Sequence, residues 1–335
     1  MTSDIHQYVE RPTNRVATES LYFDRTIRAL YSTIRENAPF AYNLLLSKRA
    51  SAMMGFMKFD LPRVNKKEIP SHLFDRLHIR REELLDPIDG FDSYRKVFER
   101  KIKYWKYRPL PDHPDAVVSP ADSRMLPGSF CRQKSLFIKE KFFNFIELIG
   151  RDKPRWLHKF DRGDFAIFRL TPDKYHYNHA PVSGRVADIY EINGVFHSCN
   201  PGAIVKSVTP CSKNRRMVTV IDTDVENGSR VGLVAMIEIV AMMIGRIVQC
   251  YSDRKYHDPQ PVEKGLFIRI GQPKSLFRPG SSTTVLIFEK NRIALSTDLI
   301  QNSKRTDVQS RFSEGFGTPL VETEVSVGEI IGKGL

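Results

Sequence analysis

A Gly-Ser-Ser turn that leads into an apolar, β-type segment is the first candidate for chemistry. Gly280-Ser281-Ser282 is followed by two threonines and then by Val285-Leu286-Ile287-Phe288. A serine hydroxyl held beside the carbonyl of its own preceding residue can attack it, so that an ester replaces the peptide bond. β-Elimination then leaves an N-terminal pyruvoyl group, an electrophile that no ordinary side chain supplies. The alternative is an ordinary hairpin turn, since Gly and Ser are common turn residues.

Two histidines three residues apart, His176 and His179, lie just before a turn that contains Pro181. Either imidazole is a candidate acid or base, because histidine titrates near neutral pH. The same spacing is compatible with structural histidines or with a metal pair. Further metal ligands would have to come from His197 or Cys199, and no tight ligand cluster completes the set. We therefore expect no metal.

The third candidate is Asp122, which stands between a proline turn and a basic residue in Ser119-Pro120-Ala121-Asp122-Ser123-Arg124. Taken by itself, the pattern predicts a turn or a helix cap. An Asp, a His and a Ser can also form a relay in which the carboxylate orients an imidazole that deprotonates the hydroxyl. Order along the chain carries no geometry, so both interpretations of Asp122 stay open at this point.

The elements that must position these residues change in character near residue 110. Apolar residues have helical spacing over residues 20–61, and a second helical stretch covers 93–102. Short apolar, β-branched runs then alternate with Gly, Pro, Asn and Asp. These runs are 117–118, 165–170, 204–208, 217–221 and 285–288. The predicted fold class is α+β, with an N-terminal helical segment (1–110) followed by a predominantly antiparallel β catalytic domain (111–335).

The chain is strongly basic. Its 335 residues include 52 Lys and Arg against 39 Asp and Glu, for a formal net charge of +13. This excess predicts an anionic partner, and no zinc-finger, RNA-recognition or basic heptad pattern supports nucleic acid. The four cysteines are widely spaced and the first residues lack a signal-peptide pattern, which favours a reducing, cytoplasmic setting.

The apolar segment 231–248 is similar in composition to a membrane-spanning helix. It contains Glu238, Arg246 and two glycines, and it is shorter than the roughly 20 apolar residues that a spanning helix needs. We expect two buried strands instead. The helical segment 20–61, with Arg and Lys among its apolar residues, is compatible with a basic amphipathic surface or with helices packed on the core.

Four ordered motifs together resemble the phosphatidylserine decarboxylase proenzyme family. They are Ser119-Pro120-Ala121-Asp122, the run 175–184 with both histidines, Asn200-Pro201, and Gly280-Ser281-Ser282-Thr283 with its following strand. Flanking similarity at 91–109, 137–150 and 325–332 extends the resemblance over most of the chain. Two departures from the family pattern are Ser123, where Gly is common, and Tyr177, where Arg is common.

The resemblance implies a self-processing, pyruvoyl-dependent decarboxylase that converts phosphatidylserine to phosphatidylethanolamine and carbon dioxide through a Schiff base. It assigns Asp122 and His179 to the self-processing relay and His176 to the decarboxylation. The family's Ser-Thr-x-x-x-x-Phe pattern selects Ser282 as the pyruvoyl precursor, while its usual preceding Gly selects Ser281, which stays the alternative.

Cleavage at 281/282 would give a large subunit (1–281) and a small subunit (282–335). The run 239–245 resembles the family's glycine-containing pocket segment, so the expected substrate pocket includes Ile239, Met242, Met243 and Gly245. The basic charge fits peripheral association with an anionic membrane. The oligomeric state stays open, a homo-oligomer included.

Two alternatives stay open, the first within the same superfamily and the second from another class of protein. One is a pyruvoyl-dependent decarboxylase that acts on a free, aromatic amino acid instead of a phospholipid. The other is a non-catalytic, lipid-binding β domain whose Gly-Ser-Ser turn never cleaves. The first would release carbon dioxide from a soluble substrate, and the second would remain a single chain.

Overall fold

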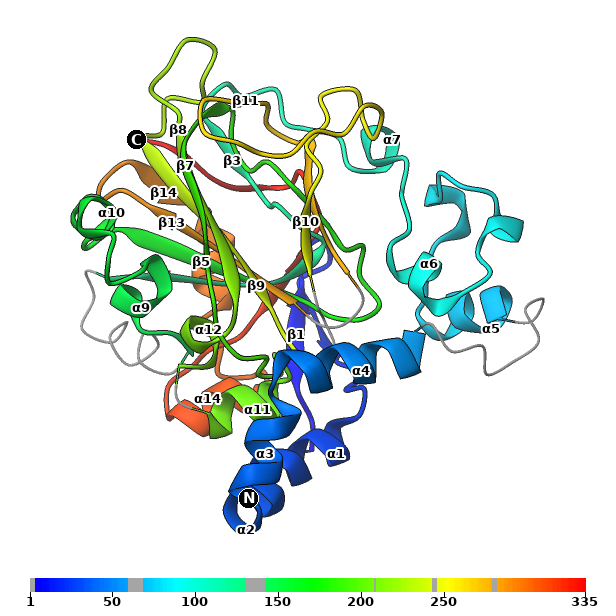
Figure 1. The fold of residues 1–335 in the computed structure, drawn as a ribbon. Coiled ribbons are helices and arrows are strands. Elements are labelled where there is room, and N and C mark those ends of the chain that lie inside the picture. Colours follow the sequence, from blue (N-terminus) through cyan, green and yellow to red (C-terminus); the bar gives the residue numbers. More distant parts are fainter. Residues whose placement is uncertain (1–3, 60–68, 131–141, 208, 243–245, 279–281) are drawn as a thin grey trace.

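The computed structural model describes residues 4–59, 69–130, 142–207, 209–242, 246–278 and 282–335. A ten-stranded sheet forms its centre (Figure 1). Its strands are β1 (Gln7–Glu10), β2 (Arg15–Thr18), β4 (Ser123–Ser129), β5 (Asp164–Leu170), β7 (Gly184–Ile192), β8 (Arg216–Asp222), β9 (Leu233–Val240), β11 (Phe267–Ile268), β13 (Ser282–Phe288) and β15 (Thr323–Val325). They are ordered β11-β7-β8-β9-β13-β5-β4-β15-β1-β2, and only the β1–β15 pair within this sheet is parallel.

Two three-stranded antiparallel sheets complete the β structure of the described residues. One has the order β10-β12-β6 and the other the order β14-β16-β3. Their strands are β3 (Ala116–Val118), β6 (Tyr177–His179), β10 (Ile247–Gln249), β12 (Pro273–Phe277), β14 (Ile293–Leu295) and β16 (Ile330–Gly334).

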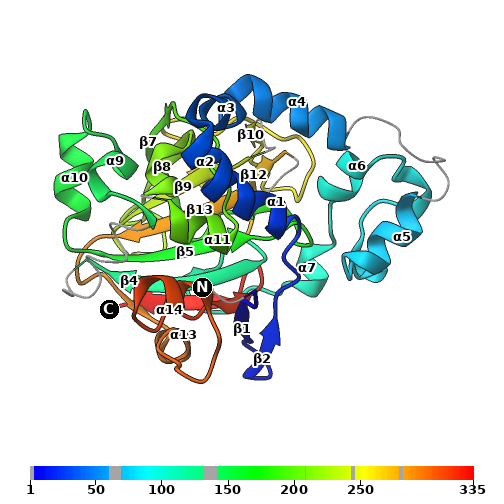
Figure 2. The same cartoon turned by 90° about the horizontal axis from the view of Figure 1, so that it is seen from below.

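The helices gather in groups around the sheets (Figures 1 and 2). Those before residue 110 are α1 (Asp24–Ala29), a π-helical turn (Leu30–Ile34), α2 (Arg35–Asn37), α3 (Pro39–Leu45), α4 (Lys48–Phe59), α5 (Ile69–Arg76), two 3₁₀ turns (Arg81–Glu83 and Ile88–Gly90), α6 (Tyr94–Phe98) and α7 (Tyr104–Tyr107). Those after it are α9 (Phe145–Ile149), α10 (Pro154–Phe160), α11 (Pro201–Lys206), α12 (Pro210–Lys213), α13 (Thr297–Asn302) and α14 (Arg311–Phe316). Helices α1–α4 lie together, away from α9 and α10.

Strand β13 is buried on both faces, which explains its continuous apolar run. Val285 and Ile287 belong to one core cluster, whereas Leu286 and Phe288 belong to another. Because successive side chains of a strand point to opposite faces, the two clusters lie on opposite sides of the sheet. A strand covered on both faces has no reason to alternate apolar and polar residues. β13 is therefore among the most protected elements of the fold.

The structure confirms the α+β class and most of the β-type runs. The runs 117–118, 165–170, 217–221 and 285–288 lie in β3, β5, β8 and β13. The apolar segment 231–248 contains β9, which is buried as expected, and the first two residues of β10, which is only partly buried. No helix among the described residues has the length and apolar character that crossing a membrane requires.

Two expectations about elements were wrong. Ile204 and Val205 lie in helix α11 instead of a strand, because the Asn200 side chain accepts a hydrogen bond from the amide of Gly202 (2.8 Å) and Pro201 fits the first helical position. The helix expected over 93–102 ends at Phe98.

The N-terminal segment is not helical throughout. Residues 7–18 form the β1–β2 hairpin, and β1 pairs with β15 near the end of the chain. The helical part begins only at Asp24. The division of the chain near residue 110 stays a prediction.

Candidate active site

Ser282 is the first residue of β13, between two hydrogen-bonded neighbours. It lies opposite Leu170, the last residue of β5, and opposite Val240, the last residue of β9. The side chain is fully buried, and its Oγ atom has no hydrogen-bond partner among the described residues. A buried hydroxyl without a partner is unfavourable, and among the described residues Ser282 shares this state with other hydroxyls, including those of Thr171, Thr219 and Thr323.

Three connections cross from the central sheet to the β10-β12-β6 sheet close to Ser282. β5 continues to β6, β9 continues to β10, and β12 continues to β13. In the small sheet Ile247 pairs with Phe277, and the Phe277 amide donates a hydrogen bond to the carbonyl of His176 (3.1 Å). His176 is thus hydrogen-bonded to the last residue of β12, five positions before Ser282 in the chain.

His176 is fully buried and has one free ring nitrogen. Its Nδ1 atom lies 2.7 Å from the carbonyl of Lys174, which can only accept, so Nδ1 carries the proton. Burial, together with the positive charge of Arg100, lowers the pKa of His176 to about 3. The ring is therefore neutral, and its Nε2 lone pair has no partner among the described residues. The Phe98 ring covers the His176 imidazole, and the centroids of the two rings are 3.6 Å apart.

His179 is also buried and neutral, but both of its ring nitrogens are engaged. Nδ1 donates to the carbonyl of Gly271 (2.7 Å), so Nε2 accepts from the hydroxyl of Tyr175 (2.9 Å). Burial lowers the pKa of His179 to about 4. The Tyr175 hydroxyl in turn lies 2.7 Å from that of Tyr256, which continues the hydrogen-bonded chain.

Asp122 is a buried carboxylate that binds an arginine. The Arg108 guanidinium donates to both of its oxygens (Nε–Oδ1 3.1 Å and Nη2–Oδ2 2.8 Å), and the Val327 amide donates to Oδ1 (2.8 Å). Although burial opposes the charge, Arg108 lowers the pKa of Asp122 to about 2. Arg108 also binds Glu83 through two hydrogen bonds. Asp122 is thus a fixed negative charge.

The predicted relay residues lie in adjacent segments without a direct contact between their side chains. The His179 amide donates to the carbonyl of Pro120 (2.7 Å), two residues before Asp122. Within the described part of the chain, no hydrogen bond joins Asp122 to His179 or His179 to Ser282. The negative charge of Asp122 still acts on His179 by raising its pKa against the effect of burial. Ser281, the alternative nucleophile, lies outside the described residues.

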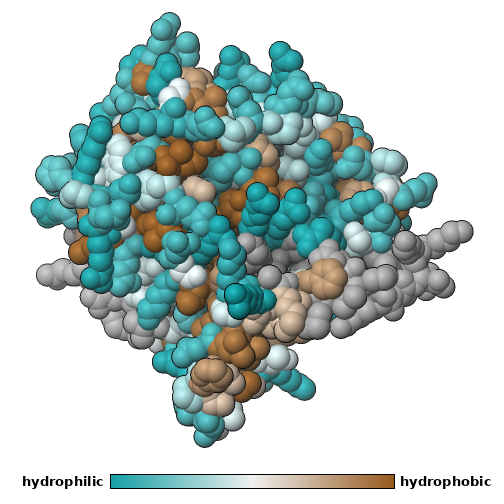
Figure 3. All heavy atoms as spheres, viewed as in Figure 1, coloured by the Kyte–Doolittle hydropathy of each residue, from teal (hydrophilic) through white to brown (hydrophobic). Residues whose placement is uncertain are grey.

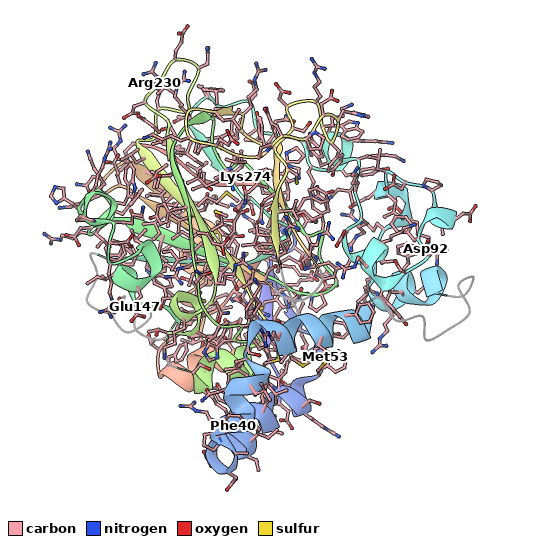
Figure 4. All side chains as sticks on the ribbon, in the orientation of Figure 1. Phe40, Met53, Asp92, Glu147, Arg230 and Lys274 are labelled. Atoms are coloured by element: carbon pink, nitrogen blue, oxygen red, sulfur yellow. The ribbon has the colours of Figure 1, made fainter. Side chains whose placement is uncertain are left out.

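A buried polar network connects the two sheets beside Ser282. Thr284, on the same face of β13 as Ser282, donates to Asn178 of β6 (Oγ1–Oδ1, 2.8 Å). The contacts continue through a serine of β12 to Glu238, which forms an ion pair with Lys274 (2.8 Å). Both charged side chains are fully buried, and Figure 4 shows Lys274 in the interior of the molecule. The network ties β13 to the strands that carry the site.

A cavity of about 300 Å³ opens next to these residues. Its lining includes Leu170, the cross-strand neighbour of Ser282, and Phe98, which covers His176. Met242, one of the expected pocket residues, lines it as well. Ile239 instead lies in the core on one face of the sheet and is not among the lining residues. Met243 and Gly245 lie outside the described residues.

A second polar cluster forms where the N-terminal segment meets the sheet. The ligand atoms of His6, Glu19 and Glu322 lie within 4.8 Å of one another, which is compatible with a metal site. However, the Arg169 guanidinium donates to both carboxylates: Nε lies 2.9 Å from Oε1 of Glu322, and Nη1 lies 2.9 Å from Oε1 of Glu19. Arg124 also forms an ion pair with Glu19. Two arginines balance the two carboxylates, so the cluster is an ion network that anchors the N-terminal segment.

Several residues of the site were not assigned a role from the sequence. Arg108 and Phe98 belong to the motifs that flank the site, yet their spacing gives no sign that Arg108 binds Asp122 or that Phe98 covers His176. Tyr175 lies inside the histidine motif, but its hydrogen bond to His179 depends on the loop that precedes β6. An arginine followed by proline between two structured regions was the one available signal for Arg108.

This chain is similar to known phosphatidylserine decarboxylases. The sequence profile of the phosphatidylserine decarboxylase family matches residues 94–318. The chain is 28% identical over 322 residues to the phosphatidylserine decarboxylase proenzyme of Fusobacterium nucleatum, covering 93% of this chain and 97% of the relative. It is 28% identical over 336 residues to the Chlamydia trachomatis proenzyme, covering 97% and 96%. Proenzyme 3 of Schizosaccharomyces pombe is 30% identical over 330 residues, but these make up only 30% of that longer protein.

A match over residues 94–318 covers most of the chain, and the chain belongs to the phosphatidylserine decarboxylase family. It is therefore an enzyme that acts as a decarboxylase, as the resemblance of its motifs predicted. This result favours the phospholipid interpretation over both the free amino acid alternative and the non-catalytic alternative.

Proposed function

We propose that this decarboxylase makes its own reactive carbonyl group by cutting the Ser281–Ser282 bond, and that it then acts on phosphatidylserine at an anionic membrane surface. The observation that supports this most is the buried, unpartnered Oγ of Ser282 at the start of a central strand. It lies five positions after Phe277, to which His176 is hydrogen-bonded. The proenzyme names of the relatives agree with an enzyme that is processed.

His179 is the base of the self-cleavage in this proposal. Its Nε2 atom exchanges the hydroxyl of Tyr175 for that of Ser282 and takes the serine proton. The serine oxygen attacks the carbonyl carbon of Ser281, the C–N bond breaks, and the nitrogen takes up the proton. Elimination then removes the Cα proton of Ser282 and breaks the Cβ–O bond of the ester, which divides the chain and leaves a free carboxylate on Ser281 and a dehydroalanine at position 282. Water would hydrolyse the imine tautomer of that dehydroalanine to the pyruvoyl ketone, with release of ammonia. Asp122, fixed by Arg108, favours the positive charge that His179 acquires.

The residues around Ser282 fit a pyruvoyl group. The serine side chain is enclosed, and it makes no hydrogen bond to the described residues that such a conversion would break. A pyruvoyl group there supplies an electron-accepting ketone for the amine of the substrate. His176 is the neighbouring proton carrier, because its neutral ring has a free lone pair on Nε2. A neutral imidazole cannot hold the substrate carboxylate by charge, so proton transfer is the role that its environment favours.

The two subunits stay associated after cleavage in this proposal. The small subunit would begin with β13, which pairs with β5 and with β9 along most of its length. It also contributes β15 and β16 to two different sheets. Because all these strands are paired with the large subunit, loss of one peptide bond leaves the sheet intact.

Membrane binding is assigned to the exposed face of α3 and α4. Phe40 is 82% exposed, and Leu44, Met53 and Phe56 are each more than half exposed. Figure 3 shows hydrophobic atoms gathered over α3, and Figure 4 shows Phe40 and Met53 at the outer side of these helices. Exposed apolar side chains with basic neighbours such as Lys48 are typical of surfaces that dock on anionic bilayers.

The test of this function compares substrates and serine variants. Purified enzyme is offered phosphatidylserine in mixed micelles, free serine and free tryptophan, and carbon dioxide is measured. We expect release from phosphatidylserine and none from the free amino acids. Ser282→Ala should abolish both chain cleavage and this release, whereas Ser281→Ala should still be cut. Release from tryptophan but not from phosphatidylserine would refute the proposed substrate, and the reverse behaviour of the two serine variants would move the cut by one residue.

A further inference from the structure

The cavity beside Ser282 has a reacting end and an outer end. The reacting end is formed by Leu170 and Phe98, which adjoin Ser282 and His176. The outer end includes Arg76, at the last position of α5, and Tyr22 from the segment before α1. A volume of about 300 Å³ matches the lower limit for pockets that bind small ligands. It can hold a headgroup, while acyl chains would remain outside.

The charged lining residues differ in whether their charge is already neutralised. Glu19 and Arg169 line the cavity, but they bind each other through two hydrogen bonds within the buried ion network (2.9 and 2.6 Å). Arg76 is exposed, and in the described part of the chain its guanidinium has neither an ion pair nor a hydrogen bond. Arg76 is therefore the cation of this cavity that is available to an anionic ligand.

A tyrosine hydroxyl accompanies Arg76 at the outer end. The Tyr22 hydroxyl lies 3.4 Å from the carbonyl of Arg76, and the Arg76 guanidinium lies 6.0 Å from the Tyr22 ring centre. Burial raises the pKa of Tyr22, so its hydroxyl remains protonated; it donates to the Arg76 carbonyl and would exchange this long contact for a ligand oxygen. Phe23 lines the same cavity and is 53% exposed, which gives the opening an apolar edge. A cation, a donor and an apolar edge together fit a phosphodiester that is attached to a lipid.

We propose that Arg76, assisted by Tyr22, binds the phosphodiester of the substrate headgroup and so selects lipid-linked serine over free serine. This inference rests on the proposed function, because it assumes that the serine end of the headgroup reaches Ser282. The phosphodiester is the anion that separates phosphatidylserine from free serine, and both molecules share the amine and the carboxylate. A guanidinium offers two parallel N–H donors that match two phosphate oxygens.

The experiment uses soluble substrates, so that membrane binding does not enter. The processed enzyme, Arg76→Gln and Arg76→Lys are compared on a short-chain phosphatidylserine kept below its micelle concentration and on glycerophosphoserine. Arg25→Gln is the matched control, because Arg25 is another exposed arginine, on α1, that does not line the cavity. Each variant is first checked for self-cleavage and thermal stability, which a position at the outer end of the cavity should leave intact.

We expect Arg76→Gln to raise KM about tenfold for both phosphodiesters, the loss of one charge-assisted hydrogen bond, with kcat changed less than about twofold. The KM of Arg76→Lys should lie between those of the unmodified enzyme and Arg76→Gln. The KM of Arg25→Gln should equal that of the unmodified enzyme. Equal KM values for Arg76→Gln and the control would overturn the role of Arg76 while leaving the proposed function in place. An unmodified enzyme that is cleaved but acts on neither phosphodiester would overturn both.

Discussion

The strands around Ser282 and the helices α3 and α4 are built in opposite ways. β13 is hydrogen-bonded on both edges and buried on both faces, whereas α3 and α4 leave Phe40 and Met53 largely exposed to solvent. A reaction that starts from one backbone bond needs groups held within a fraction of an ångström, which a central strand provides. Docking on a bilayer needs only apolar surface and charge. Variants of the two regions should therefore affect different measurements.

The largest effects are expected from the two histidines. His179→Ala should leave the chain uncut, because the proposed base for Ser282 is lost, and loss of a general base costs about 10²–10⁴ in rate. His176→Ala should still yield two chains but should release carbon dioxide at a rate lower by a similar factor. Denaturing gels and carbon dioxide assays on the same preparations separate the two roles. Normal cleavage in His179→Ala would contradict the assignment of the base.

The next largest effect is expected from the buried ion pair between Lys274 and Glu238. Lys274→Met leaves Glu238 buried without its partner, which should lower the free energy of unfolding by about 3–5 kcal/mol. The control is Arg254→Met, which breaks an exposed pair with Asp258 and should change it by less than about 1 kcal/mol. Urea unfolding of both variants makes the comparison. Equal losses would show that the network beside Ser282 does not stabilise the sheets.

Stability should fall as the solution becomes more acidic. Burial lowers the pKa of His176 to about 3 and that of His179 to about 4, whereas both titrate near 6.5 in an unfolded chain. Below pH 6.5 the unfolded chain therefore binds protons that the folded chain does not. Between pH 6.5 and 5.5 the free energy of unfolding should drop by about 1 kcal/mol per histidine. Urea titrations at these pH values test this, and a constant or rising stability would contradict buried neutral imidazoles.

The smallest effect concerns the exposed helices. Phe40→Gln should weaken binding to anionic vesicles about tenfold, since one apolar side chain inserted in a membrane contributes roughly 1–3 kcal/mol. Self-cleavage and activity on soluble substrates should not change. Ile146→Gln is the control, because Ile146 is half exposed on α9, outside the group formed by α1–α4. If flotation showed the same loss for Ile146→Gln, the membrane surface would not be confined to α3 and α4.

Much of the sheet could be predicted because its strands are locally encoded. The β-branched runs in β5, β8 and β13 were recognised, and the apolar segment 231–248 was resolved into two strands by its charges and glycines. Ile204 and Val205 misled the prediction, because the cap formed by Asn200 outweighs their preference for strands. The pairing of β1 with β15 joins residues more than 300 positions apart, and no local pattern encodes such a contact.

In the candidate site, too, the contacts between distant segments could not be predicted from local sequence. The motifs supplied Asp122, His176, His179 and Ser282, because the types of these residues are tied to chemistry. The environment of each one depends on partners from distant segments, as when Arg108 binds Asp122 and Tyr175 binds His179.

The most direct test of the central claim is the intact mass of the purified, unmodified enzyme under denaturing conditions. The account predicts two chains, the first ending at Ser281 and the second starting at position 282 with a blocked N-terminus whose mass matches a pyruvoyl group. A cut one bond earlier would move the assignment to Ser281. A single full-length chain in a preparation that releases carbon dioxide from phosphatidylserine would contradict the account.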